Sequence, residues 1–239
     1  MPQKKPLNQG HLASSQKTRW GVCFSPFFVL AALLAASPAA RCQTPPSQQE
    51  SFQGGKNEFG VWASYAPGSP HVIGLTSPRQ FATLGFRYGR MLLDHPRWSL
   101  EYTFDVDPVE IMLQPKILGS MSTPGGRVYI TGSREVVYGG GVNPLGFKIN
   151  LFRRRSFQPF VASTAGFVAS LRPIPVDIHG EEQFNFTFDF QAGFQLYNSS
   201  RKRAWMFGYK YQHISNADRG EINPGVDLNT VFLGYSFFK

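Results

Sequence analysis

Strict alternation of apolar and polar residues is the feature that most limits how this chain can fold. Between residues 184 and 196, the odd positions hold Asn, Thr, Asp, Gln or Gly. The even positions are all apolar: Phe184, Phe186, Phe188, Phe190, Ala192, Phe194 and Leu196. Because successive side chains of a β-strand point to opposite faces, this segment predicts a strand with one apolar and one polar face.

The same two-residue period recurs through the rest of the chain after residue 57. It is clear at 82–88 and 98–106 and weaker elsewhere. Each segment has about the length, roughly nine to eleven residues, that crosses a bilayer when the strand is tilted. The predicted strands are 58–65, 82–88, 98–106, 144–151, 158–169, 184–196, 203–215 and 227–238.

The composition of the two faces favours a membrane barrel over a soluble β-sandwich, which would also alternate. The apolar face is aromatic, in a chain with 22 Phe and 9 Tyr. The other face carries polar residues such as Glu101, Asp105 and Asp107, which we expect in the interior opposite Arg87 and Lys148. In a small transmembrane barrel the polar face fills the interior and the apolar face meets lipid. We therefore predict an all-β fold, an eight-stranded antiparallel up-and-down transmembrane β-barrel.

The expected connections alternate in length, which supports the same topology. Long and short connections alternate in an up-and-down outer-membrane barrel, with the short turns and both chain ends on the periplasmic side. Gly139, Gly140 and Gly141 fall in the third connection and predict a bend or turn. The expected connections are 66–80, 92–97, 107–143, 152–157, 170–182, 197–202 and 216–226.

The N-terminal part predicts export. Basic residues precede an apolar run at 20–40 that ends in small residues, the pattern of a secretory signal. We expect a signal peptide at 1–42, a polar spacer at 43–57 and the barrel at 58–239; an N-terminal membrane anchor is the other reading. The two cysteines, Cys23 and Cys42, lie in or beside the signal, which excludes a disulfide framework or a cysteine-based metal site in the exported chain.

The net charge of +9 raises the question of a nucleic-acid partner. Much of that charge precedes the apolar run, and the rest forms short clusters at 153–155 and 201–203, between predicted strands. A basic rim beside anionic lipid head groups explains such clusters equally well. We therefore expect a membrane protein that does not bind nucleic acid.

Candidate chemistry gathers where the last two predicted strands meet. The apolar face of 203–215 ends in His213 and Ser215, and Asp227 flanks the same connection. A serine, a histidine and a carboxylate can form a nucleophile, its base and the group that orients the base. Polar side chains are cheaper at the membrane interface than at mid-membrane, so we expect these three at the outer rim of one hairpin. The simpler alternative is that they only mark a strand end.

The stretch from Tyr211 to Asp227 resembles the outer-membrane lipid A 3-O-deacylases, the PagL family, also labelled acyloxyacyl hydrolases. That family is marked by a His-x-Ser-Asn-Ala run, a loop containing Asn and Gly, and then an acidic residue, and residues 213–217 here read His-Ile-Ser-Asn-Ala. The resemblance implies that His213 is the general base and Ser215 the nucleophile. Asp227 falls where the best-known members have Glu.

Further roles follow from the same resemblance. It implies that Asn223 helps to hold the oxyanion and that Asn216 supports the site, with Glu221 as a fallback acid. The family's important earlier phenylalanine matches Phe184, Phe186 or Phe188 equally well.

The implied activity is removal of the 3-O-linked 3-hydroxyacyl chain of lipid A, within lipopolysaccharide, in the outer leaflet of a Gram-negative outer membrane. It needs no metal and no cofactor. Two other functions stay open: a non-enzymatic barrel for structure, adhesion or ligand binding, and an esterase acting on phospholipid. The oligomeric state is also open, a homodimer included.

Overall fold

The computed structural model describes residues 56–76, 79–123, 126–152, 155–174 and 182–239, without the side chains of residue 117 and residues 120–131. The predicted signal peptide and nearly all of the predicted spacer lie outside these residues. Among the described residues, no helix is long and apolar enough to cross a bilayer.

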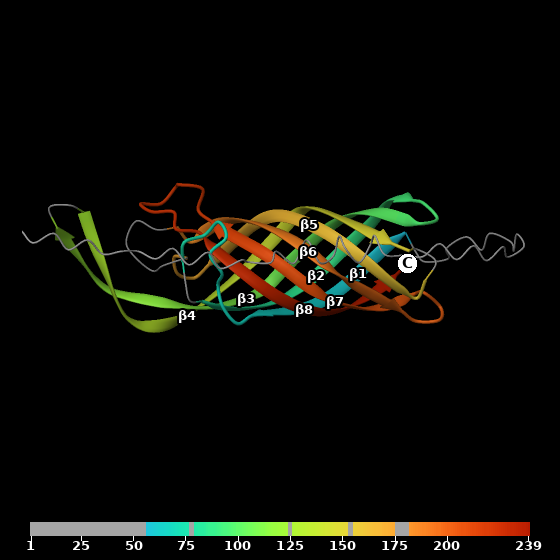
Figure 1. The fold of residues 1–239 in the computed structure, drawn as a ribbon, viewed down its shortest axis with the longest axis horizontal. Helices are drawn as coiled ribbons and strands as arrows, with labels where there is room; N and C mark the ends of the chain where they lie inside the picture. Colours follow the sequence, from blue (N-terminus) through green and yellow to red (C-terminus); the bar gives the residue numbers. More distant parts are fainter. Residues whose placement is uncertain (1–55, 77–78, 124–125, 153–154, 175–181) are drawn as a thin grey trace, which may run out of the picture. The chain divides into compact units, whose positions relative to one another are not determined.

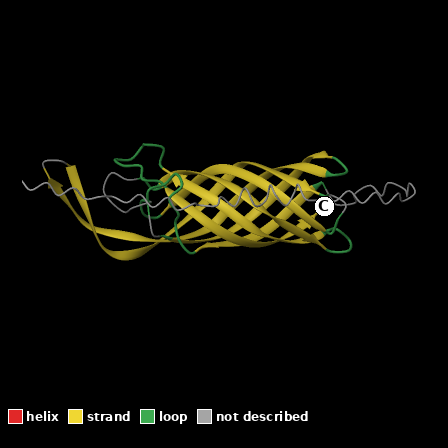
Figure 2. Cartoon of the chain, in the orientation of Figure 1, coloured by secondary structure: helices red, strands yellow, loops and turns green. Residues whose placement is uncertain are grey.

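Eight strands form the barrel, and each runs antiparallel to the next (Figures 1 and 2). β1 also pairs with β8, in a register that runs from Glu58 opposite Phe238 to Tyr65 opposite Val231, so the sheet closes on itself. The predicted fold class is therefore confirmed. The strands are β1 Asn57–Ala66, β2 Gln80–Asp94, β3 Trp98–Thr123, β4 Gly126–Leu151, β5 Phe157–Ser170, β6 Phe184–Tyr197, β7 Arg203–Ser215 and β8 Val226–Phe238.

Alternation along each strand separates the lipid-facing surface from the interior, as predicted. In β6, Asn185, Thr187 and Asp189 are buried, whereas Phe190 and Leu196 on the other face are about half exposed. This arrangement leaves an aromatic surface outside, where a bilayer takes the place of water.

Two groups of charged side chains inside the barrel form ion pairs. Arg87 donates from Nε and Nη2 to the two carboxylate oxygens of Asp105, at 2.8 and 2.7 Å. Lys148 contacts Glu58 and lies 2.8 Å from Glu101. The predicted placement of Glu101 and Asp105 opposite Lys148 and Arg87 is thus confirmed, and pairing offsets part of the desolvation cost of these buried ions.

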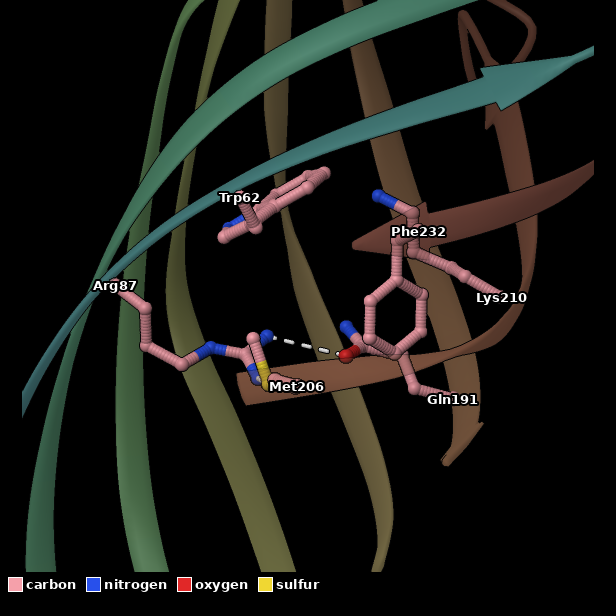
Figure 3. Close-up of a pocket in the computed structure, with 6 residues that line it drawn as sticks. All are labelled: Trp62, Arg87, Gln191, Met206, Lys210 and Phe232. Carbon is pink, nitrogen blue, oxygen red and sulfur yellow. Dashed lines mark hydrogen bonds between the residues drawn. The ribbon is translucent and has the colours of Figure 1, made fainter. Parts of the chain in front are cut away.

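The interior also contains apolar layers, which the simple picture of a polar interior did not predict. Figure 3 shows the apolar side chains Trp62, Met206 and Phe232 beside the polar side chains Arg87, Gln191 and Lys210. The cavity that these residues line has a volume of about 10 Å³, close to the lower limit for one water molecule. A second apolar cluster lies inside the barrel near the loops that include β1–β2 and β7–β8. Its members are Ala66, Phe81, Met112, Val137, Val168, Ile174, Ile214, Val226 and Leu228.

The predicted loop at 107–143 is wrong, because most of it belongs to β3 and β4. Beyond the last partners of β2 and β5, these two strands continue as a ribbon in which 114–123 pair with 126–135 (Figure 1, green). The three glycines at 139–141 predicted a bend, but the antiparallel ladder accommodates glycine, here beside an irregularity in the register. Gly140, predicted in a bend, lies in β4 opposite a register shift between Asp107 and Glu110.

The other connections keep the predicted alternation of long and short. The segments 67–79, 171–183 and 216–225 are long, and 95–97, 152–156 and 198–202 are short. The start of β1 and the C-terminus lie at the same rim, where Asn57 N donates to Lys239 O at 2.8 Å. The His213–Asp227 hairpin end lies at the opposite rim, with the long connections.

Candidate functional site

The β7–β8 hairpin brings a histidine and an aspartate face to face. His213 and Asp227 are direct partners in the β-ladder, and both side chains lie on the outward face. His213 Nδ1 lies 2.7 Å from Asp227 Oδ1. Because the ring N–H at Nδ1 faces the carboxylate, Nε2 is the nitrogen left to accept a proton.

The Asp227 carboxylate accepts several hydrogen bonds besides its contact with His213. Its Oδ1 also accepts a hydrogen bond from Tyr211 Oη at 2.8 Å. Its Oδ2 accepts three backbone N–H groups, from Val72 and Ile73 at 2.6 Å each and from Gly74 at 2.9 Å. The carboxylate is fully buried, so these donors take the place of water around it. This contribution could not be predicted from the sequence, because backbone amides have no side-chain signature.

The β1–β2 loop is attached to the β7–β8 loop beside this carboxylate. Leu75 N donates to Pro224 O at 2.6 Å, and Thr76 Oγ1 donates to Gly225 O at 2.6 Å. Gly225 has φ +57°, and a Cβ there would lie 2.9 Å from His213 Cε1. A glycine is therefore required both by the backbone conformation and by the contact with the imidazole.

Ser215 follows His213 on the same outward face of β7 and is half-buried. Alternate residues of a strand are separated by about 6.6 Å along its axis, which two extended side chains can bridge. No hydrogen bond joins Ser215 Oγ to His213 among the described residues. Catalytic hydrogen bonds are often long in ligand-free proteins and tighten when substrate binds.

Phenylalanines from β6 flank both residues. Phe188 is the ladder partner of His213, with ring centroids 5.2 Å apart, and Phe186 is the partner of Ser215. The sequence left three phenylalanines equivalent. The structure brings Phe188 onto the histidine and places Phe184 and Phe186 under the Arg219 guanidinium, at 5.3 and 5.0 Å.

Asn216 shapes the loop after the candidate nucleophile. Its side chain is fully buried and donates from Nδ2 to Ile222 O at 2.8 Å. Its Oδ1 accepts Asp218 N at 3.0 Å, within a turn where Ala217 and Asp218 have positive φ. Asn216 therefore fixes the path of the chain from Ser215 into the loop.

The two remaining predicted residues lie in the same loop. Asn223 is half-buried, and its Oδ1 is buried without a hydrogen-bond partner among the described residues. Glu221 is exposed, and the carboxylate in contact with His213 is that of Asp227. Within the described ranges, no group of three or more His, Cys, Asp or Glu side chains is arranged to hold a metal ion.

The fold and this site define a class: an eight-stranded outer-membrane barrel with a histidine–carboxylate pair on its lipid-facing surface. Residues 110–236 match the sequence model of the family described as lipid A 3-O-deacylase (PagL), which is more than half of the chain. The chain therefore belongs to the PagL family, and this membership supports a deacylase activity. No curated protein matches the chain significantly.

The chain is also similar to several solved structures. The crystal structure of the outer membrane enzyme PagL aligns with a TM-score of 0.52 and 15% identity, covering 73% of this chain and 97% of that one. Neisserial surface protein A aligns with a TM-score of 0.42 and 9% identity, covering 76% and 95% of the two chains. OprG from Pseudomonas aeruginosa gives 0.41 and 9%, with coverage of 79% and 98%. At this level of identity the likeness to PagL shows the fold.

Proposed function

We propose that this protein is a lipid A 3-O-deacylase that works as a serine esterase, with Ser215 as nucleophile, His213 as general base and Asp227 as the acid that orients the base. The observation that carries the proposal is the 2.7 Å contact between His213 and Asp227 on the outward face, within the part of the chain that matches the family.

The reaction would be an acyl transfer in two steps. Asp227 holds the imidazole with Nδ1–H toward the carboxylate, so His213 Nε2 can take the proton of Ser215 as its Oγ attacks the ester carbonyl. The Asn223 side-chain amide would donate to the oxygen that becomes negative. His213 then gives its proton to the departing 3-oxygen of the glucosamine, which leaves an acyl-serine.

The second step would release the fatty acid. A water molecule loses a proton to His213 and attacks the acyl-serine carbonyl. The proton returns to Ser215 Oγ as the ester breaks, and a 3-hydroxy fatty acid leaves. Both steps use one base and one oxyanion site, as in other serine esterases.

The location of the site supports a lipid substrate. The candidate triad faces outward at the rim that carries the long connections, next to outward-facing aromatic side chains such as Phe186, Phe190 and Tyr209. Acyl chains in the outer leaflet of the outer membrane would lie against this surface.

The test is the mass of lipid A from a host that makes the fully acylated form, after expression of the chain and, separately, of Ser215→Ala. We expect loss of one 3-hydroxyacyl chain with the wild type and unchanged lipid A with the variant. Both proteins should change their gel mobility on heating, as folded barrels do. Unchanged lipid A with a folded wild-type barrel would refute the proposal and favour a binding protein or another ester substrate.

A further inference from the structure

The β1–β2 loop contributes backbone rather than side chains to the site. We propose that the Val72–Gly74 segment is a clamp that positions the acid of the triad and is matched to the length of an aspartate. The catalytic meaning of this clamp rests on the function proposed above.

The clamp is defined by where its hydrogen bonds go. Three consecutive N–H groups, 153 to 155 residues away in sequence, converge on one oxygen, Asp227 Oδ2, at 2.6 to 2.9 Å. The other oxygen, Oδ1, accepts hydrogen bonds from His213 and Tyr211. With Oδ2 fixed by the loop, the carboxylate cannot rotate without breaking several bonds, so Oδ1 stays on His213 Nδ1.

Close packing of two glycines holds the clamp in place. A Cβ added at Gly74 would lie 2.8 Å from Gly225 O and 2.9 Å from Gly225 C, both backbone atoms. A side chain at position 74 must therefore push the loop away from the β7–β8 loop. Gly68, in the same loop, has no atom within 4 Å of its added Cβ, which makes it a matched control.

The distances also explain why an aspartate suits this chain. Oδ2 is already at hydrogen-bond distance from the three loop nitrogens. A glutamate at position 227 would add one methylene, which lengthens the side chain by about 1.5 Å. The longer carboxylate would have to displace either the loop or its contact with His213. A loop moved away by a larger residue at position 74 would remove this conflict.

The first experiment tests for the hydrogen bonds from residues 72–74 to Asp227 and does not depend on enzymatic activity. Backbone amide resonances of Val72, Ile73 and Gly74 are recorded for the full chain refolded in detergent micelles, as wild type, Asp227→Ala and Asp218→Asn. We expect the three amides to move upfield and lose protection from hydrogen exchange in Asp227→Ala alone. Amides that keep their shifts and protection without Asp227 would overturn the proposal.

The second experiment uses deacylation of lipid A in vesicles. Gly74→Ala should lower kcat by about tenfold or more with little change in KM, because a misplaced acid weakens the base rather than substrate binding. Gly68→Ala should match the wild type. Asp227→Glu should also lower kcat in the wild-type background, but should raise it in the Gly74→Ala background.

The kinetic experiment can also contradict the proposal. If the effects of Gly74→Ala and Asp227→Glu simply multiply, the loop and the acid are not matched in length and the proposal is wrong. If the wild type leaves lipid A unchanged, the proposed function fails, and the amide resonances still decide whether the clamp exists.

Discussion

At the scale of single residues, the site depends on groups that have little freedom to move. His213 is 7% exposed, between Phe188 on one side and Gly225 on the other. Its Nδ1 is fixed on a carboxylate whose oxygens are both hydrogen-bonded. Such fixed donors and acceptors need no rearrangement when charge develops during a reaction, which is the main way an esterase site lowers its barrier.

Gly225 gives a prediction at this scale. Gly225→Ala places a methyl group 2.9 Å from His213 Cε1 at a residue with φ +57°, so the imidazole must move. We expect deacylation of lipid A in vesicles to fall by at least about tenfold, the usual cost of a misplaced catalytic group. Activity equal to that of the Gly68→Ala control would show that the imidazole position is not limiting.

At the scale of structural elements, the barrel strands and the β3–β4 ribbon have different roles. Residues 114–123 of β3 pair with β4 alone, because β2 begins at Gln80, opposite Leu113. Two-stranded ribbons gain little stability by themselves. The ribbon therefore adds little to the closed sheet that holds the site.

Shortening the ribbon tests this division. Replacing residues 116–133 by a two-residue Asn-Gly turn should leave the barrel's heat-dependent mobility shift and its urea midpoint unchanged, since every barrel strand keeps both neighbours. The urea midpoint is measured by tryptophan fluorescence in detergent micelles. A large drop in the midpoint would mean that the ribbon supports the barrel wall.

The elements also show which parts of the structure could be predicted. Alternation predicted all eight strands because a strand between lipid and a filled interior needs opposite faces of opposite polarity. The ribbon was missed because Pro108, Pro115 and nearby glycines are typical of loops, whereas antiparallel pairing between the consecutive strands β3 and β4 extends through them. The closeness of His213 and Asp227 could be predicted, since both flank one hairpin connection. The role of residues 72–74 could not, because main-chain donors look the same in every sequence.

At the scale of the whole molecule, the barrel is a filled cylinder. Ion pairs, amide side chains and apolar layers occupy the interior, and the cavity shown in Figure 3 is about 10 Å³. A rigid wall follows from such packing, and a rigid wall is what keeps side chains from different strands in register on the outer face. The packed interior therefore holds the strands in place, while the candidate site itself lies on the outer face of the barrel.

The buried ion network gives a prediction for the whole molecule. Lys148→Met would leave the carboxylates of Glu58 and Glu101 without their shared cation inside the barrel. We expect the free energy of unfolding in urea to fall by about 3–5 kcal/mol, the usual cost of breaking a buried ion pair from one side. Arg90→Met, at an exposed position, is the control. Equal stability of the two variants would mean that the network is not needed to hold the barrel.

The central claim is that Ser215 is an activated nucleophile on the lipid-facing surface. The most direct measurement is covalent labelling by a lipophilic fluorophosphonate, located by peptide mass spectrometry, in the folded wild type, His213→Ala and Asp227→Ala. We predict one adduct, on Ser215 of the wild type, that is lost without His213 and strongly slowed without Asp227. Labelling of Ser215 at an equal rate in all three proteins, or a wild type that deacylates lipid A while Ser215 stays unlabelled, would contradict the claim.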